Sequence, residues 1–192
     1  ITTRPVARGL NLENLRILVV DDNTHVRTLV RTILHALGIR DVDVASDGMS
    51  GFEAFIRLEY DIIITDLEMK PLTRIEFVDL VRTSRKSPNP YIPIVMVTAF
   101  TDKERVTKAR DHGVTEFLAK PFTFESLLSR LTTIIEKPRP FIRTADYFGP
   151  DRRRHIDAYY SGPERRKTEA QTIEPKSKIA LVDGGKIAGS RS

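Results

Sequence analysis

Short apolar runs recur along the first 120 residues of the chain, and four of them end on a polar side chain. These four runs cover residues 16–20, 61–65, 94–97 and 116–119, and a fifth, shorter run covers residues 42–45. Continuous apolar runs of this length are typical of strands that are buried on both faces, as in a parallel sheet flanked by helices. We therefore predict four buried strands, together with a short second strand over residues 42–45.

Apolar residues between and after these runs recur at helical spacing. The clearest stripe is the last one, which consists of Phe124, Leu127, Leu128, Leu131, Ile134 and Ile135. Gly38 and Gly113 follow the first and fourth helical patterns, where glycine commonly ends a helix. Five strands that alternate with five helices predict an α/β fold with a parallel sheet. The predicted organisation is an N-terminal extension (1–14), an α/β domain (15–137) and a tail (138–192).

The polar residues at the strand ends are candidates for a functional site. They are Asp21, Asp22, Asp66, Thr98 and Lys120. Parallel sheets place their sites at the carboxyl ends of the strands, so these five side chains should converge. Three carboxylates, a hydroxyl and an ammonium group suit a divalent metal ion and a transferred phosphoryl group. Each residue alone has an ordinary structural explanation, but their combination at one sheet edge favours a functional site.

Composition narrows the class of protein. The 192 residues contain no cysteine, which excludes disulfides and thiol catalysis and fits a reducing compartment. No apolar run is long enough to cross a membrane, and residues 1–9 lack the apolar core of a signal peptide. We therefore expect a cytoplasmic protein without membrane insertion. Of 31 basic and 26 acidic residues, the tail holds 12 and 7, so the whole excess of positive charge belongs to the tail.

The tail is rich in Arg, Pro, Gly and Ser and contains a near-repeat. Its two copies, residues 149–154 and 162–167, both read Gly-Pro-acid-Arg-Arg-basic. We expect a largely irregular tail, because its apolar content is too low for an independent core. Only residues 179–182 could add a short strand. A solvated extension, a protein-docking element and a contact with single-stranded nucleic acid all remain open. The acids spread among the bases favour docking and make nucleic acid an unlikely partner.

The order of the strand-end residues resembles the receiver domain of bacterial response regulators. The resemblance covers roughly residues 14–137 and includes the pair Lys120-Pro121 after the last strand. It implies a flavodoxin-like (βα)5 doubly wound parallel sheet with the strand order 2-1-3-4-5.

The resemblance also implies a role for each candidate residue. Asp66 would be the phosphoacceptor, Thr98 and Lys120 would contact the phosphoryl group, and Phe117 would be an aromatic switch residue. The cofactor would be Mg²⁺, and its protein ligands would be Asp21, Asp22, Asp66 and the backbone carbonyl of Glu68.

A signalling module is the function that the resemblance implies, and not an enzyme that acts on outside substrates. A histidine kinase or phosphotransfer protein would phosphorylate Asp66, and a downstream protein would read the result. Homodimerisation through the last helices and the last strand is one form that this contact could take. Two alternatives stay open: an Mg²⁺-dependent phosphohydrolase with an aspartyl nucleophile, and a pseudo-receiver that is never phosphorylated and acts as a scaffold.

The segment after Asp66 departs from the pattern of the family. Lys70 and Arg74 stand where receivers usually have Pro and Gly. Arg74 lacks the freedom of glycine to adopt a positive φ, and this departure supports the pseudo-receiver alternative. Phe100, two residues after Thr98, should flank the path of the hydrolytic water, and we predict that it slows the loss of phosphate from Asp66.

Overall fold

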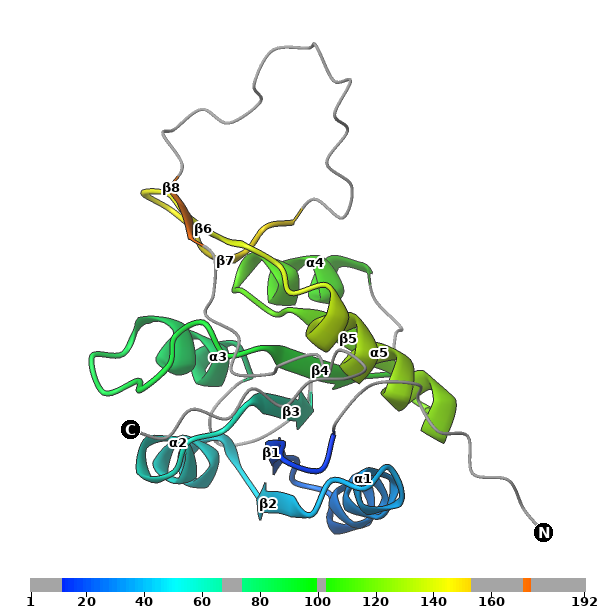
Figure 1. Cartoon of the computed structure of the whole chain (residues 1–192). Helices are drawn as coiled ribbons and strands as arrows, with labels where there is room; N and C mark the ends of the chain where they lie inside the picture. Colours follow the sequence, from blue (N-terminus) through cyan, green and yellow to red (C-terminus); the bar gives the residue numbers. More distant parts are fainter. Residues whose placement is uncertain (1–11, 67–73, 100–102, 153–170, 174–192) are drawn as a thin grey trace, which may run out of the picture.

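The computed structural model describes residues 12–66, 74–99, 103–152 and 171–173 (Figure 1). Its main element is a five-stranded parallel sheet in the order β2-β1-β3-β4-β5, which confirms the predicted fold and strand order. The strands of this sheet are β1 (Arg16–Val20), β2 (Asp41–Ala45), β3 (Ile62–Asp66), β4 (Ile94–Thr98) and β5 (Glu116–Ala119).

Five helices alternate with these strands and cover both faces of the sheet (Figure 1). They are α1 (Thr24–Ala36), α2 (Gly48–Arg57), α3 (Arg74–Thr83), α4 (Lys103–Asp111) and α5 (Phe124–Glu136). Core residues of α1 and α5 belong to one buried cluster, and core residues of α2, α3 and α4 belong to another. The sheet therefore separates two apolar layers. Among the described residues, no helix has the length and apolar character to span a membrane.

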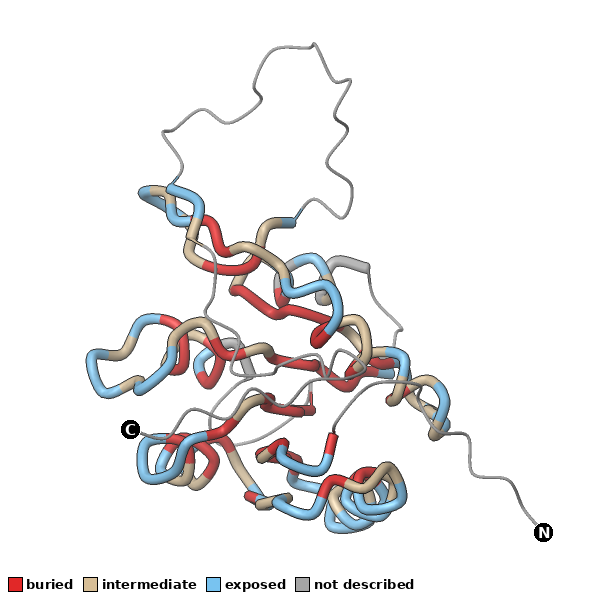
Figure 2. Tube along the Cα trace, viewed as in Figure 1, coloured by how far each residue is buried: buried red, intermediate tan, exposed pale blue. Residues whose placement is uncertain are grey.

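Alternation along each strand explains the two layers. In β1, Leu18 and Val20 face the cluster of α2, α3 and α4, whereas Ile17 and Val19 face the cluster of α1 and α5. Successive side chains of a strand point to opposite faces, so a strand buried on both faces must be apolar at every position. Figure 2 shows this as buried strands at the centre of the described molecule.

Local signals set the ends of several helices. Asn23 caps α1 by accepting hydrogen bonds from the backbone N–H groups of His25 and Val26. Thr123 and Ser126 form a reciprocal capping box at the start of α5. Gly38 and Gly113 have φ angles of 95° and 97°, which confirms glycine as the residue that follows α1 and α4.

Part of the tail is regular, which the sequence did not predict. The structure adds a second, antiparallel sheet in the order β7-β6-β8. Its strands are β6 (Phe141–Arg143), β7 (Phe148–Pro150) and β8 (Gln171–Ile173). We call residues 141–150, which comprise β6, β7 and the turn between them, the C-terminal hairpin. Residues 179–182, which the sequence suggested as a short strand, lie outside the described residues.

The C-terminal hairpin packs on the α/β domain through an aromatic cluster. The ring of Tyr91, in the loop before β4, lies 5.3 Å from the ring of Phe141 and 5.5 Å from that of Phe148, both edge-on. Phe141 and Ile142 are buried. The apolar residues of the tail thus find their core on the domain, which explains how a segment too polar to fold alone is ordered here.

Candidate functional site

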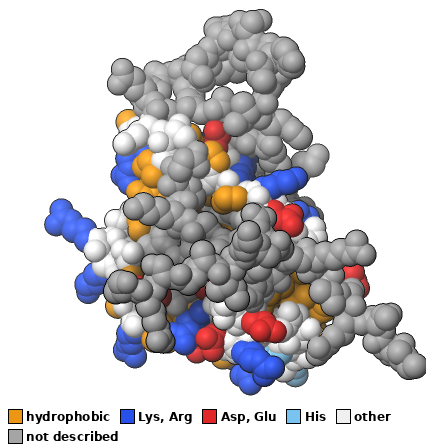
Figure 3. Space-filling view, in the orientation of Figure 1, with side chains coloured by type: hydrophobic (Ala, Val, Ile, Leu, Met, Phe, Trp, Pro, Cys, Tyr) orange, Lys and Arg blue, Asp and Glu red, His pale blue; other side chains and the backbone are white. Residues whose placement is uncertain are grey.

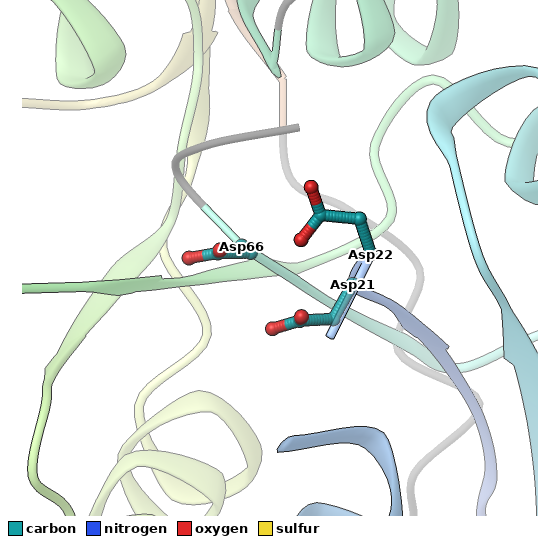
Figure 4. A group of neighbouring side chains, drawn as sticks. All are labelled: Asp21, Asp22 and Asp66. Atoms are coloured by element: carbon teal, nitrogen blue, oxygen red, sulfur yellow. The ribbon is translucent and has the colours of Figure 1, made fainter. Parts of the chain in front are cut away.

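Three carboxylates meet at the carboxyl end of the parallel sheet, as predicted from the sequence. Asp21 and Asp22 follow β1 and Asp66 ends β3, and these two strands are neighbours in the sheet. One carboxylate oxygen from each residue lies within 4.8 Å of the others. Asp21 and Asp66 are buried, with 2% and 7% exposure, whereas Asp22 is exposed (Figure 4). The cluster therefore has a buried floor and one side open to solvent.

Lys120 brings a positive charge to this cluster from the end of β5. Its Nζ lies 2.9 Å from Oδ1 of Asp66 and 3.7 Å from Oδ2 of Asp21. The Lys120-Pro121 peptide bond is cis. The backbone N–H of Lys120 donates a 2.7 Å hydrogen bond to the carbonyl oxygen of Thr98. The lysine thus bridges the two buried acids, while its backbone joins the ends of β4 and β5.

Asp21 has a perturbed affinity for protons. Burial raises the pKa of its carboxyl group, and the negative charges of Asp66 and Asp22 raise it further. A hydrogen bond from the backbone N–H of Asn23 and the charge of Lys120 act in the opposite direction. A cation bound between the carboxylates would relieve both the repulsion and the desolvation of the charged form.

The donor set fits a hard divalent cation such as Mg²⁺. Mg²⁺ prefers oxygen ligands, uses one or two carboxylates and keeps several waters. The three carboxylates supply such oxygens within 4.8 Å of one another, and exposed Asp22 leaves a side for water and for a phosphoryl oxygen. Asp21, Asp22 and Asp66 are therefore the residues that would hold the ion.

Thr98 lies on the strand next to that of Asp66, and Phe117 lies one strand further along the sheet. Thr98 ends β4, which pairs with β3, and it is buried. Phe117 is half-buried in β5 and packs against the apolar cluster that includes Ala109 of α4 and Val114. Both residues thus lie on the strands that follow β3 in the sheet, and their roles stay predictions.

Several sequence predictions concern residues outside the described part of the chain. Glu68, with its carbonyl as a proposed metal ligand, lies in residues 67–73, together with Lys70. Phe100 lies in residues 100–102. Arg74 begins α3, but its side chain is not described. The predictions for these four residues stay untested.

Asn23 is a site residue that the sequence reasoning missed. Its backbone N–H donates a 2.7 Å hydrogen bond to Oδ1 of Asp21, which orients that carboxylate. The side chain of Asn23 also caps α1, so one residue fixes both the acid pair and the start of the helix. An Asn placed directly after an acid pair and before a helical pattern was the signal that could have indicated it.

A separate cavity of about 750 Å³ lies at the opposite end of the sheet. Its lining includes Arg16 at the start of β1, Tyr91 before β4 and Phe141 of the C-terminal hairpin. None of the five predicted strand-end residues lines it. The cavity is therefore separate from the carboxylate cluster.

Comparison with known protein families identifies the type of domain that the parallel sheet and its helices form. Residues 17–132 match the model of the response regulator receiver domain. Chemotaxis protein CheY-3 of Vibrio cholerae is 29% identical over 125 residues, which cover 65% of this chain and 95% of that protein. Transcriptional regulatory protein RprY of Bacteroides fragilis is 32% identical over 127 residues, which cover 66% of this chain and 52% of that protein.

Solved structures share the fold of the domain. The chemotaxis response regulator CheY4 of Vibrio cholerae is 32% identical and superposes with a TM-score of 0.57, over 62% of this chain and 98% of that one. The receiver domain of sensor histidine kinase PA1611 from Pseudomonas aeruginosa PAO1 is 27% identical, with a TM-score of 0.56, over 62% and 94% of the two chains. That second structure has a magnesium ion coordinated in its active site cleft.

Proposed function

The chain belongs to the family of response regulator receiver domains, and from this membership we propose that it takes up a phosphoryl group on Asp66 and signals through altered protein contacts. Members of the chemotaxis type are signalling proteins and not enzymes with outside substrates. The observation that carries the proposal is the contact of Lys120 with Asp66, 2.9 Å apart, beside the acid pair.

Asp66 is the nucleophile of the proposed reaction. A carboxylate oxygen of Asp66 forms a bond to phosphorus as the bond between phosphorus and a donor nitrogen or oxygen breaks, and the electron pair leaves with the donor. The product is an aspartyl phosphate. In this reaction the protein catalyses only its own phosphorylation and the later hydrolysis of the product.

Charge neutralisation is the main task of the surrounding residues. A carboxylate that attacks an anionic phosphoryl group meets repulsion, and Mg²⁺ held by Asp21, Asp22 and Asp66 would supply the positive charge that screens it. Lys120 adds a fixed cation where the charge of the transition state spreads over the phosphoryl oxygens. Because Lys120 already contacts Asp66, it needs no reorganisation to do so.

Thr98 and Phe117 would convert the new charge into a change of shape. The hydroxyl of Thr98 donates a hydrogen bond to a phosphoryl oxygen and draws its loop inward, and Phe117 rotates into the space that is vacated. The surface formed by α4, β5 and α5 then differs between the two states, which is the difference that a partner can read.

The partners that fit this function are proteins. A histidine kinase or phosphotransfer protein in the cytoplasm would supply the phosphoryl group, and a downstream protein, or a second copy of the chain, would bind the switched surface. On the face shown in Figure 3, Lys and Arg side chains are interspersed with Asp and Glu over the described residues, a distribution that suits protein contacts better than a nucleic-acid backbone.

Intact mass spectrometry with acetyl phosphate and Mg²⁺ tests the proposal. We expect one phosphoryl adduct in the wild-type chain, and none in Asp66→Asn or when EDTA removes the metal ion. Asp61→Asn, which changes an acid at the opposite end of β3, is the matched control and should still form the adduct.

Two other outcomes would replace the proposal by an alternative. A wild-type chain that forms no adduct, and whose Phe117 region does not respond to beryllium fluoride, would be a pseudo-receiver scaffold. Steady turnover of a generic phosphate monoester, lost in Asp66→Asn, would make the protein a phosphohydrolase.

A further inference from the structure

The C-terminal hairpin is seated directly on the turn between α4 and β5. A side-chain carbon added to Gly149 of β7 would lie 2.7 Å from Cα of Gly113 and 2.6 Å from the hydroxyl oxygen of Tyr147. One added to Gly113 would lie 3.1 Å from the carbonyl oxygen of Phe148 and 3.1 Å from Nε of Arg82. The two backbones therefore touch without side chains between them. Any shift of this turn toward β7 is blocked by hard-sphere contact.

An ion pair continues this contact to the end of α4. Arg152, two residues after β7, places Nη1 3.2 Å from Oδ1 of Asp111, the last residue of α4. The guanidinium of Arg152 also lies over the ring of Tyr147, with Cζ 4.1 Å from the ring centroid. The hydroxyl of Tyr147 donates a 2.7 Å hydrogen bond to the carbonyl oxygen of Pro150. Contacts within the tail thus hold Arg152 in the position from which it reaches Asp111.

A buried arginine contacts both the α4–β5 turn and the C-terminal hairpin. Arg82 of α3 donates hydrogen bonds to the carbonyl oxygens of Gly113, Pro90 and Ile92, at distances between 2.7 and 3.1 Å. Its Cζ lies 5.1 Å from the ring centroid of Phe141 in the C-terminal hairpin. One guanidinium therefore joins α3, the loop before β4, the α4–β5 turn and the tail.

Helix α4 connects the contact with the C-terminal hairpin to the proposed switch residues Thr98 and Phe117. It begins at Lys103, five positions after Thr98, and ends at Asp111, which Arg152 contacts. Its residue Ala109 belongs to the same apolar cluster against which Phe117 packs. A movement of the Thr98 loop or of Phe117 must therefore be accommodated by α4, and the far end of α4 is held by the C-terminal hairpin.

We propose that the C-terminal hairpin acts as a restraint on phosphorylation, because it holds α4 in the position that belongs to the unphosphorylated state. This inference rests on the proposed function of Asp66. The contacts of Gly149 and Arg152 fit α4 as it lies when Lys120 contacts Asp66, so they stabilise this state more than a state with a displaced α4. Coupling between two sites is reciprocal. Phosphorylation must then loosen the C-terminal hairpin, and loosening the C-terminal hairpin must favour phosphorylation.

Two substitutions release the restraint in different ways. Gly149→Ala forces β7 away from Gly113, and Arg152→Ala removes the contact with Asp111 while leaving both backbones unchanged. Arg57→Ala, which removes an exposed ion pair with Glu53 on α2, is the matched control for Arg152→Ala. The full chain is used throughout, and protection of the β1 and β3 amides against hydrogen exchange verifies that each variant is folded.

The experiment measures both directions of the coupling. The first readout is the rate of adduct formation from acetyl phosphate and Mg²⁺. We expect it to rise by about five-fold or more in Arg152→Ala and Gly149→Ala, because releasing α4 raises the population of the reactive conformation, and to stay unchanged in Arg57→Ala. The second is hydrogen exchange at the amides of β6 and β7 in the wild-type chain, which should become faster with beryllium fluoride and Mg²⁺.

The outcomes separate this inference from the proposed function. If the wild-type chain forms the adduct, but its rate does not change in either variant and β6–β7 exchange does not respond, the restraint is refuted and the receiver function stands. A slower rate in both folded variants also refutes it, since the C-terminal hairpin would then assist the reaction. If no chain forms the adduct, the proposed function fails and the restraint falls with it.

Discussion

The two ends of strands β4 and β5 each hold a buried or half-buried cation, but the partners of these cations differ in kind. At the carboxyl end, Lys120 contacts the carboxylates of Asp66 and Asp21, whose charges change when a metal ion or a phosphoryl group arrives. At the amino end, Arg82 binds the carbonyl oxygens of Gly113, Pro90 and Ile92 and lies over Phe141.

Backbone carbonyls do not titrate, so the charges of the groups that Arg82 binds do not change when the site binds a metal ion or a phosphoryl group. Burial lowers the pKa of Arg82 to about 9, which still leaves the guanidinium charged at neutral pH. The carboxyl end of the strands, which we call the responsive end, therefore holds a cation whose partners change their charge, whereas the amino end, which we call the fixed end, holds a cation whose partners keep the same charge. Removing Arg82 at the amino end should therefore lower the free energy of unfolding, whereas removing Lys120 at the carboxyl end should slow the phosphorylation of Asp66.

Arg82→Met removes the cation of the fixed end, and we expect it to have the largest effect of the substitutions considered, a loss of stability. The substitution keeps an apolar stem but leaves three carbonyls without their donor, so we expect a loss of about 4 kcal/mol in the free energy of unfolding. Urea unfolding followed by circular dichroism measures it. Arg57→Met, in which the replaced side chain is 75% exposed, is the control and should change stability little. Equal losses in the two variants would show that Arg82 is no anchor.

Lys120→Met breaks the responsive end. Removing a cation aimed at the reacting group should slow adduct formation on Asp66 by about 100-fold, because one donor that stabilises a developing charge is worth about that much. The rate with acetyl phosphate and Mg²⁺ is measured by intact mass. Lys137→Met, at the end of α5, is the matched control. A rate within a factor of two of wild type would remove Lys120 from the proposed chemistry.

Asp21→Asn tests whether the buried negative charge of Asp21 at the responsive end destabilises the folded state. Because burial raises the pKa of Asp21, the folded state holds the proton more tightly than the unfolded state does. The stability that this supplies is present below pH 3.8 and is lost as pH rises through the folded pKa. In EDTA at neutral pH, we therefore expect the variant to unfold at a higher urea concentration than the wild-type chain.

Two controls belong to this prediction. The gain should vanish below pH 3.8, where the carboxyl is protonated in both states. Added Mg²⁺ should stabilise the wild-type chain more than the variant, because it binds the folded state through the carboxylates. A variant that is less stable than wild type in EDTA at neutral pH would contradict the destabilising effect assigned to the buried charge of Asp21.

Asp47→Ala tests an acid at the same edge of the sheet whose charge is favourable, and its effect should be the smallest. Asp47 caps α2, and hydrogen bonds from the backbone and side chain of Ser50 lower the pKa of its carboxyl group. The stabilisation is present above pH 3.8 and is lost as pH falls through the folded pKa. At neutral pH we expect a loss of about 1 kcal/mol on urea unfolding.

The dependence on pH distinguishes this cap from the acids of the site. Both differences shrink on acidification, but they have opposite signs: at neutral pH wild type is more stable than Asp47→Ala and less stable than Asp21→Asn. Asp47→Asn keeps an oxygen that can accept the capping hydrogen bond and should lose only a few tenths of a kcal/mol. A loss in Asp47→Asn as large as in Asp47→Ala would mean that the charge, and not the hydrogen bond, stabilises α2.

The responsive end could be predicted from sequence because its signals are local. Each of Asp21, Asp66, Thr98 and Lys120 stands at the end of an apolar run, and the convergence of strand ends is a property of any parallel sheet. The strand order came from resemblance to a family, since apolar runs alone do not say which strands are neighbours.

The fixed end could not be predicted in the same way. Strands of three residues have no readable period, and the tail becomes ordered only through Tyr91, which lies about 50 positions before Phe141. Arg82 looks like an ordinary surface arginine of a helix, and its burial depends on Phe141 covering it. Asn23 was missed for a different reason: it holds Asp21 through a backbone N–H, which every residue type except proline has, so only its capping position before the helical pattern could have indicated it.

The position of Phe141 over Arg82 also determines how much of the chain must be kept when this domain is transferred to another protein. A family match that stops at residue 132, and a last helix that stops at Glu136, both suggest a cut near residue 137. Such a cut would remove the ring of Phe141, which lies over the guanidinium of the buried Arg82. Anyone who transplants this receiver into another protein, or joins a new output module to it, should therefore carry the chain through Arg152 and attach the foreign sequence beyond it.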